Sequence, residues 1–146
     1  MRAGLDDGAR IHPMTDGPFE LTRFPVHLGL GGTAEQLSEC DGTMEWFERY
    51  AAEHASDGVD GRIVTVSTFT ASWDTWEMHP RGAELVACIE GAMTLHQEID
   101  GETRAAVLSA GEAIVNAPGV WHTADIDDRA MAFFVTAGAG TVHRPR

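Results

Sequence analysis

Short apolar or alternating runs fill the chain after about residue 60, and each run ends at a turn signal. This spacing is typical of an antiparallel sandwich or barrel. Asp100-Gly101 is the strongest hairpin signal, because both residues tolerate the positive φ that a two-residue turn requires. Eight strands, enough for a closed double sheet, are predicted at residues 62–71, 73–79, 84–90, 92–99, 103–109, 113–116, 122–126 and 130–137.

The chain before residue 60 has a different pattern. Residues up to 18 are polar, charged and glycine-containing, which predicts a loose or draped arm, and residues 19–28 predict one peripheral strand. Residues 44–54 carry apolar side chains at positions 44, 47 and 51, which favours an amphipathic helix. Asp41 and Thr43 are both candidates for its N-cap, and Gly58 is a plausible stop.

Length and charge limit the classes of protein to which this chain can belong. The chain has 146 residues, 43% of them hydrophobic, which suits one domain with a sizeable core. Within it we expect residues 1–59 to form an arm, strand and helix packed on a barrel of residues 60–146. The net charge of -13 opposes binding to nucleic acid or to anionic membranes.

Membrane and secretory signals are weak in this sequence. No apolar run approaches the roughly 20 residues needed to cross a bilayer, and the first residues lack the apolar centre of a signal peptide. We therefore expect a cytoplasmic protein. Cys40 and Cys88 lie far apart in unlike settings, so free thiols are the better interpretation.

Two histidines and two carboxylates lie where strand geometry can aim them at one point. Glu77 and His79 are two residues apart and so share a face of their strand. Glu84 begins the next apolar run, and His122 follows a Pro-Gly turn. An unpaired carboxylate beside such a run would cost several kcal/mol, so Glu84 needs a cation or a proton. Two histidines and up to two carboxylates are the minimum set of donors for a first-row divalent metal site.

The spacing of these residues resembles the first motif of the cupin superfamily, small jelly-roll barrels that commonly hold one divalent metal. That motif reads Gly, five residues, His-x-His, three or four residues, Glu, six residues, Gly. His79 matches its second histidine, and Glu84 and Gly91 match its glutamate and closing glycine. Glu77 replaces the first histidine, and Ala71 replaces the opening glycine.

The second cupin motif reads Gly, five residues, Pro-x-Gly, two residues, His, three residues, Asn. Gly111, Gly119 and His122 fall on its register, Pro118 sits one position late, and Ile126 occupies the Asn position. The resemblance covers about residues 60–137. It implies an all-β fold, a double-stranded β-helix or jelly roll, with an N-terminal extension that contains one short helix.

The resemblance also implies a ligand set. Carried over by position, the metal ligands are His79, Glu84 and His122, with Glu77 in the place of the missing histidine. One divalent ion is implied, and Zn, Mn, Fe and Ni all remain open. Two carboxylates make the set more anionic than the usual three histidines and one glutamate. It is closer to cupin phosphomannose isomerases, in which Gln occupies the Glu77 position.

Two classes of function stay open. One is a metal-dependent enzyme of the isomerase or dioxygenase type that acts on a small polar molecule, such as a sugar or a diol-like substrate. In it Glu77, if it does not ligate the metal, would be the catalytic residue that moves a proton. The other is a non-catalytic cupin that binds or senses a small molecule. The outward side chains of Leu85, Ala87 and Ile89 suggest a homodimer, as small cupins commonly form.

Several further residues have a structural interpretation beside a functional one. The barrel or a dimer face would bury Trp73, Trp76 and Trp121, and a ligand platform is the alternative. Cys88 is expected to be a small buried hydrophobe. His96 fits either the pocket or a solvated face.

Overall fold

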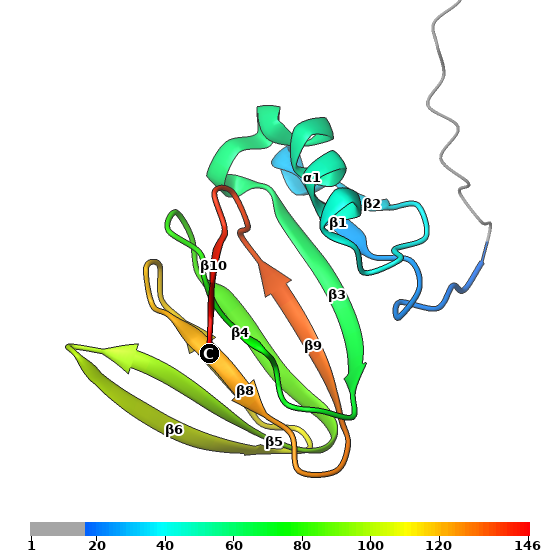
Figure 1. Cartoon of the computed structure of the whole chain (residues 1–146). Helices are drawn as coiled ribbons and strands as arrows, with labels where there is room; N and C mark the ends of the chain where they lie inside the picture. The colour runs from blue at the N-terminus through cyan, green and yellow to red at the C-terminus, as the bar shows by residue number, and fades with distance from the viewer. Residues whose placement is uncertain (1–16) are drawn as a thin grey trace, which may run out of the picture.

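Ten β-strands and one α-helix make up residues 17–146, which the computed structural model describes (Figure 1). The loose arm predicted for residues up to 18 lies almost wholly outside these described residues. The strands are β1 Val26–Leu28, β2 Ala34–Gln36, β3 Arg62–Phe69, β4 Thr75–Met78, β5 Glu84–Ile99, β6 Glu102–Ser109, β7 Ala113–Asn116, β8 His122–Asp125, β9 Ala130–Thr136 and β10 Val142–Pro145. The helix α1 is Met44–Glu53, and 3-10 turns cover Leu30–Gly32 and Ala55–Asp60.

The long strand β5 belongs to two sheets. Its first half pairs with β7 and β9, and its second half pairs with β6 and β8, all antiparallel. One sheet therefore runs β7-β5-β9-β3-β1-β2, and the other contains β10, β4, β8, β5 and β6. This double sheet confirms the predicted all-β jelly roll.

The prediction of two strands over residues 84–99 was wrong, because β5 continues through Gly91. That glycine has φ 74, and a Cβ there would lie 2.1 Å from the carbonyl oxygen of Arg129. The register with β9 shifts between Cys88 and Glu90, so the strand bends at a bulge without ending. Asp100-Gly101, with φ 54 and 78, does close a hairpin between β5 and β6, as predicted.

The remaining strand predictions were right in place; the strand at residues 113–116 was exact, and the others differ from the structure at one or both ends. Of the predicted run 19–28 only Val26–Leu28 is a strand, because a turn precedes it in which the Glu20 carbonyl accepts hydrogen bonds from the Arg23 and Phe24 amides. The pattern of apolar positions does not reveal β2 and β10, short strands at the two ends of the strand order. Their residues are mostly polar and so lack the apolar signal of a strand.

The helix was predicted correctly, although the apolar positions 44, 47 and 51 that indicated it are exposed. Thr43 caps it by accepting a hydrogen bond from the Trp46 amide, and Asp41 in turn accepts from Thr43. Met44 and Phe47 are 58% and 36% exposed, whereas Trp46 is 3% exposed. Trp46 belongs to a small buried cluster with Leu37 and Ile63, against which Tyr50 of the helix also packs.

The helix also ends earlier than Gly58, the predicted stop. Its C-cap is His54, whose backbone amide donates to the Tyr50 carbonyl, and a 3-10 turn follows that contains Gly58. The 10-residue helix is too short for a membrane span, and no other helix of residues 17–146 meets the requirements.

The main core fills the space between the two sheets. Its buried members come from β5, β6, β8 and β9 and the turn that follows β8: Val86, Cys88, Met93, Leu95, Leu108, Ala124, Ile126, Ala130, Ala132 and Phe134. Trp73 packs against this core, as the structural interpretation of that residue expects. Both cysteines are free, and Cys88 is buried, also as expected.

Candidate metal centre

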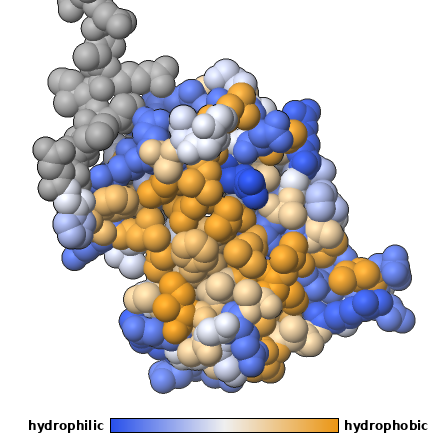
Figure 2. All heavy atoms as spheres, turned by 180° about the vertical axis from the view of Figure 1, so that it is seen from behind, coloured by the Kyte–Doolittle hydropathy of each residue, from blue (hydrophilic) through white to orange (hydrophobic). Residues whose placement is uncertain are grey.

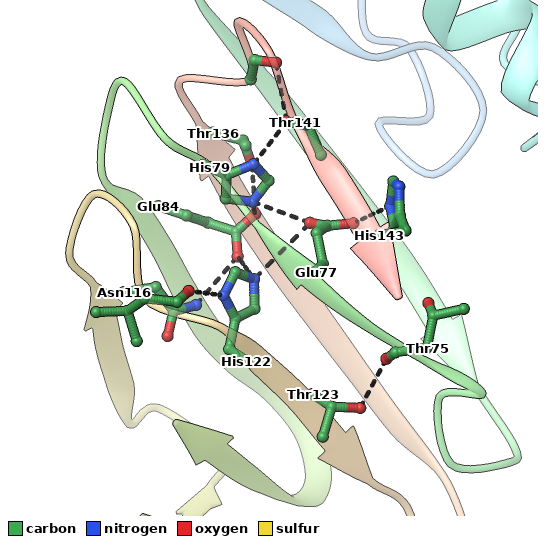
Figure 3. A network of polar contacts seen from close by, with 12 residues as sticks. Thr75, Glu77, His79, Glu84, Asn116, His122, Thr123, Thr136, Thr141 and His143 are labelled. Carbon is green, nitrogen blue, oxygen red and sulfur yellow. Dashed lines mark hydrogen bonds and ion pairs between the residues drawn. The ribbon is translucent and has the colours of Figure 1, made fainter. Parts of the chain in front are cut away.

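Four predicted ligand residues meet at one point of the structure (Figure 3). Glu77 lies in β4, His79 directly follows that strand, Glu84 begins β5, and His122 begins β8. Glu77 and His122 are direct cross-strand partners. Each residue offers one donor atom, and the four atoms lie within 4.8 Å of one another. The spacing of the two sequence motifs thus predicted a real cluster of side chains.

The separations between the donor atoms suit a metal ion. His79 Nε2 lies 2.9 Å from Glu77 Oε1 and 3.1 Å from Glu84 Oε2. His122 Nε2 lies 3.2 Å from Glu84 Oε1 and 3.8 Å from Glu77 Oε1. Ligands bound at about 2.1 Å to one ion lie about 3.0 to 3.4 Å apart when they are neighbours. The cluster can therefore hold a divalent cation with little movement.

Burial makes these polar groups expensive to leave without a cation. His79, Glu84 and His122 are 3%, 2% and 0% exposed, whereas the Glu77 side chain is 26% exposed. Removing a charge from water costs several kcal/mol unless it is paired. Two carboxylates and two neutral imidazoles would together balance the charge of one divalent ion.

The Nδ1 atoms of His79 and His122 both form hydrogen bonds with groups outside the cluster. His122 Nδ1 donates to the Val120 carbonyl at 3.0 Å. His79 Nδ1 lies 2.7 Å from Thr141 Oγ1, which donates its own hydrogen to the Gly138 carbonyl and so accepts from the imidazole. A neutral ring protonated at Nδ1 has its lone pair on Nε2. Both Nε2 lone pairs are then available to the cluster.

His122 Nε2 is the clearest indication of a missing partner. It is buried and has no hydrogen-bond partner, although Glu84 lies within ion-pair distance. Buried polar atoms are nearly always satisfied, so an orphaned one needs an explanation. A metal ion at the centre of the cluster would satisfy it.

The four groups shift one another's ionisation. Burial alone would lower the pKa of His79 and of His122, but Glu77 and Glu84 outweigh it and raise both to about 9. Burial would raise the pKa of Glu84, and the nearby imidazoles of His122 and His79 instead lower it to about 2. The pKa of Glu77 is lowered against its burial by His122, His143 and His79. Without a cation, the cluster attracts protons to its imidazoles.

Glu84 is held by neighbours that the sequence analysis did not select. Asn116 Nδ2 donates to Glu84 Oε1 at 3.2 Å, and Thr136 Oγ1 donates to Oε2 at 2.7 Å. These residues are the cross-strand partners of Glu84 on β7 and β9. Gln97 extends this hydrogen-bond network by donating to Asn116 Oδ1 at 2.7 Å. Only the strand register identifies them, and an isolated sequence does not reveal that register.

Two further missed residues come from the C-terminal segment. Thr141 contacts His79, as described above, and His143 Nε2 lies 2.8 Å from Glu77 Oε2. Thr141 directly precedes β10, and His143 lies within it. This edge strand carries no apolar sequence signal.

The other candidate residues lie outside the cluster. His96 pairs with Asp125 at 2.7 Å. The Cys88 thiol faces the carbonyls of Glu90 and Gly91, which agrees with a structural role. The rings of Trp76 and Trp121 lie 5.2 and 4.4 Å from the Arg144 guanidinium, so packing in the protein accounts for both.

Comparison with known proteins identifies the fold. No protein-family model and no curated protein matches the sequence. Among solved structures, oxalate oxidase matches with a TM-score of 0.51 and 20% identity over 63% of this chain and 50% of that chain. Oxalate oxidase with the substrate analogue glycolate matches equally. A cupin-2 domain protein from Shewanella frigidimarina matches with a TM-score of 0.44 and 19% identity, over 58% and 71% of the two chains.

These similarities bear on the fold alone, and the chain matches only half the length of oxalate oxidase. The similarity to oxalate oxidase agrees with the double sheet of β-strands. The protein has the cupin fold, as the spacing of its two motifs implied.

Proposed function

We propose that this cupin binds one divalent metal ion through His79, Glu84, His122 and Glu77. The observation that carries the proposal is the buried Nε2 atom of His122, which lacks a hydrogen bond inside a ring of donor atoms. Nitrogen and oxygen donors suit Zn, Mn, Fe or Ni, and no thiolate takes part among the described residues.

We further propose that the loaded site acts on a small polar molecule, such as a sugar or a diol-like substrate. The bound metal would polarise a substrate oxygen. Glu77 is the most exposed of the four residues, and its Oε2 faces away from the other three toward His143. It is therefore the catalytic residue we propose for moving a proton, at that oxygen. Oxalate oxidase, whose fold is similar, binds the small hydroxy acid glycolate.

A non-catalytic binding or sensing module is the second candidate. The observation that favours it is the near-complete burial of three of the four ligands, which leaves only Glu77 open to solvent. A hollow in the described chain also lies elsewhere, lined by residues 21–47 on one side and by Thr65, Val66 and Ser67 of β3 on the other.

Elemental analysis of the purified protein tests metal binding. We expect about one equivalent of a first-row divalent metal, and we expect its loss in His79→Ala and in His122→Ala. His96→Ala is the matched control, because His96 pairs with Asp125 outside the cluster. Retention of full metal content in both ligand variants would show that the site is wrong.

A substrate panel then separates the enzyme from the binding module. The metal-loaded protein is incubated with sugars, diols, oxalate and glycolate, with and without oxygen. Turnover that disappears in Glu77→Gln supports the enzyme. Binding without turnover, detected by calorimetry, supports the module instead.

We also propose that the outer face of strands β7, β5 and β9 binds a second copy of the chain. Apolar side chains gather over one face of the molecule in Figure 2. Cross-strand registers give two apolar rows on this outer face. The rows are Val115-Leu85-Val135 and Ala113-Ala87-Phe133, whose members are exposed or half-buried; the next residues along the rows, Val64 and Val66 on β3, are buried within the chain itself. With a net charge of -13, an uncharged surface suits a second copy, since strongly acidic surfaces of two copies would repel.

A further inference from the structure

The C-terminal edge strand β10 pairs with β4, which carries Glu77 and leads directly into His79. Val142 is paired with Met78 and His143 with Glu77, antiparallel. The preceding Thr141 therefore comes opposite His79, and its hydroxyl does contact that imidazole. One short segment thus touches two of the four cluster residues.

Thr141 fixes the orientation of the His79 ring. The imidazole Nδ1 donates to Thr141 Oγ1 at 2.7 Å, and the hydroxyl donates to the Gly138 carbonyl at 2.8 Å. The hydrogen bonds can run only from the imidazole to the hydroxyl and from the hydroxyl to the carbonyl, because a carbonyl cannot donate. The result is a His79 ring whose Nε2 is directed into the cluster.

The two carboxylate oxygens of Glu77 have different partners, because His143 contacts one of them. Its Nε2 lies 2.8 Å from Glu77 Oε2, while Oε1 lies 2.9 Å from His79 Nε2. In the described chain Glu77 is the one cluster residue with substantial exposure, so its carboxylate could otherwise turn toward water. The contact with His143 holds Oε1 toward the proposed metal position.

The opposite face of β10 anchors the strand to the barrel. The Arg144 guanidinium lies over the rings of Trp76 and Trp121 and forms an ion pair with Glu98. Arg146 continues the attachment by an ion pair with Asp125 at 2.7 Å. Alternation along the strand thus separates anchoring residues from residues that face the cluster.

We propose that Thr141 and His143 are positioning residues, through which β10 preorganises His79 and Glu77 for metal binding. This inference rests on the proposed metal site. Groups that orient metal ligands typically change metal affinity by about 10- to 100-fold when they are removed. The C-terminal segment is accordingly part of the metal centre as well as the edge of a sheet.

The test compares Co²⁺ binding by five variants with that of the full-length wild-type protein. Thr141→Val and His143→Ala remove the two contacts, and Thr141→Ser and His143→Gln keep a hydroxyl or an N–H donor. Val142→Ala is the matched control, because Val142 is exposed and lies between the two residues on the opposite face. The readouts are the dissociation constant by chelator competition, the visible Co²⁺ spectrum, and the melting temperature of the metal-free protein.

We expect a dissociation constant about 10- to 100-fold higher and an altered Co²⁺ spectrum in Thr141→Val and His143→Ala. The conservative variants should recover most of the affinity, and Val142→Ala should bind like the wild type. Equal affinity and an unchanged spectrum in all variants would overturn the positioning role while leaving the metal site intact. An equal loss in Val142→Ala would also overturn it. A wild-type protein that binds no Co²⁺ would instead overturn the proposed function itself.

Discussion

Glu77 differs from the other three cluster residues in both exposure and partners. Its side chain is 26% exposed, and its second oxygen contacts His143 outside the cluster. A carboxylate here adds a negative charge that a histidine would not supply. The charge strengthens attraction for a cation and should make a metal-bound water less acidic. The choice of residue at this one position thus affects both metal affinity and chemistry.

We predict that Glu77→Gln weakens metal binding about tenfold or more, because a ligand should matter at least as much as a group that only orients one. The amide keeps an oxygen in place but removes the charge. Metal competition assays measure the change. Glu102→Gln, the same substitution on the exposed strand β6, serves as the control and should bind metal normally. Unchanged affinity in Glu77→Gln would mean that Glu77 is no ligand.

We predict that metal affinity rises with pH up to about 9. In the metal-free protein the pKa values of His79 and His122 are raised to about 9, so both imidazoles are protonated at neutral pH. A metal ion must displace about two protons, and affinity should then rise about a hundredfold per pH unit below 9. The carboxylates do not offset this trend, since the pKa of Glu84 is lowered to about 2. Calorimetry in buffers of different ionisation enthalpy measures the protons released, and a release near zero at pH 7 would contradict the prediction.

Among the elements, β5 connects the two sheets of the barrel. It is 16 residues long and pairs with four other strands. Glu84 stands at its start, so the direction of β5 determines where that carboxylate enters the cluster. Gly91 allows the bend, because its backbone is left-handed and the Arg129 carbonyl occupies the space of a side chain.

We predict that Gly91→Ala destabilises the fold by more than about 2 kcal/mol, since a left-handed conformation alone costs a residue about 1 to 2 kcal/mol. The added Cβ would also lie 2.1 Å from a backbone oxygen. Gly101→Ala is the matched control, with φ 78 and no atom within 4 Å of the new Cβ. Urea unfolding should therefore show a clearly smaller loss for Gly101→Ala. Equal losses would mean that the close approach to Arg129 is unimportant.

At the scale of the whole molecule, the outer face of strands β7, β5 and β9 is the surface that we propose for self-association. The strand parity predicted from the sequence is confirmed there, since Leu85 and Ala87 are half-buried, Ile89 is 43% exposed, and the alternate residues Val86 and Cys88 are buried. The homodimer itself stays a prediction.

We predict that the protein sediments as a dimer at micromolar concentration and that Val115→Glu converts it to a monomer. Val115 is 58% exposed within the apolar rows, so a glutamate there would bury a charge only in the dimer. Val107→Glu is the control, because Val107 is 65% exposed on β6 outside the rows. A wild-type monomer, or equal dissociation of both variants, would contradict this interface.

The sequence predicted the parts of the protein that depend on local pattern. Alternation located most of the barrel strands, Asp100-Gly101 located a hairpin, and motif spacing selected Glu77, His79, Glu84 and His122. These features follow from strand parity and turn geometry, which act over a few residues.

Tertiary structure alone decided which distant residues support those parts. Strand register places Asn116 and Thr136 beside Glu84, and Thr141 and His143 beside the β4 ligands. Likewise, the choice of Trp46 over Met44 as the buried face of the helix depended on the surface that the helix covers. Short edge strands of polar residues carry no periodic apolar signal. Their pairing is set by contacts between segments that are far apart in the sequence.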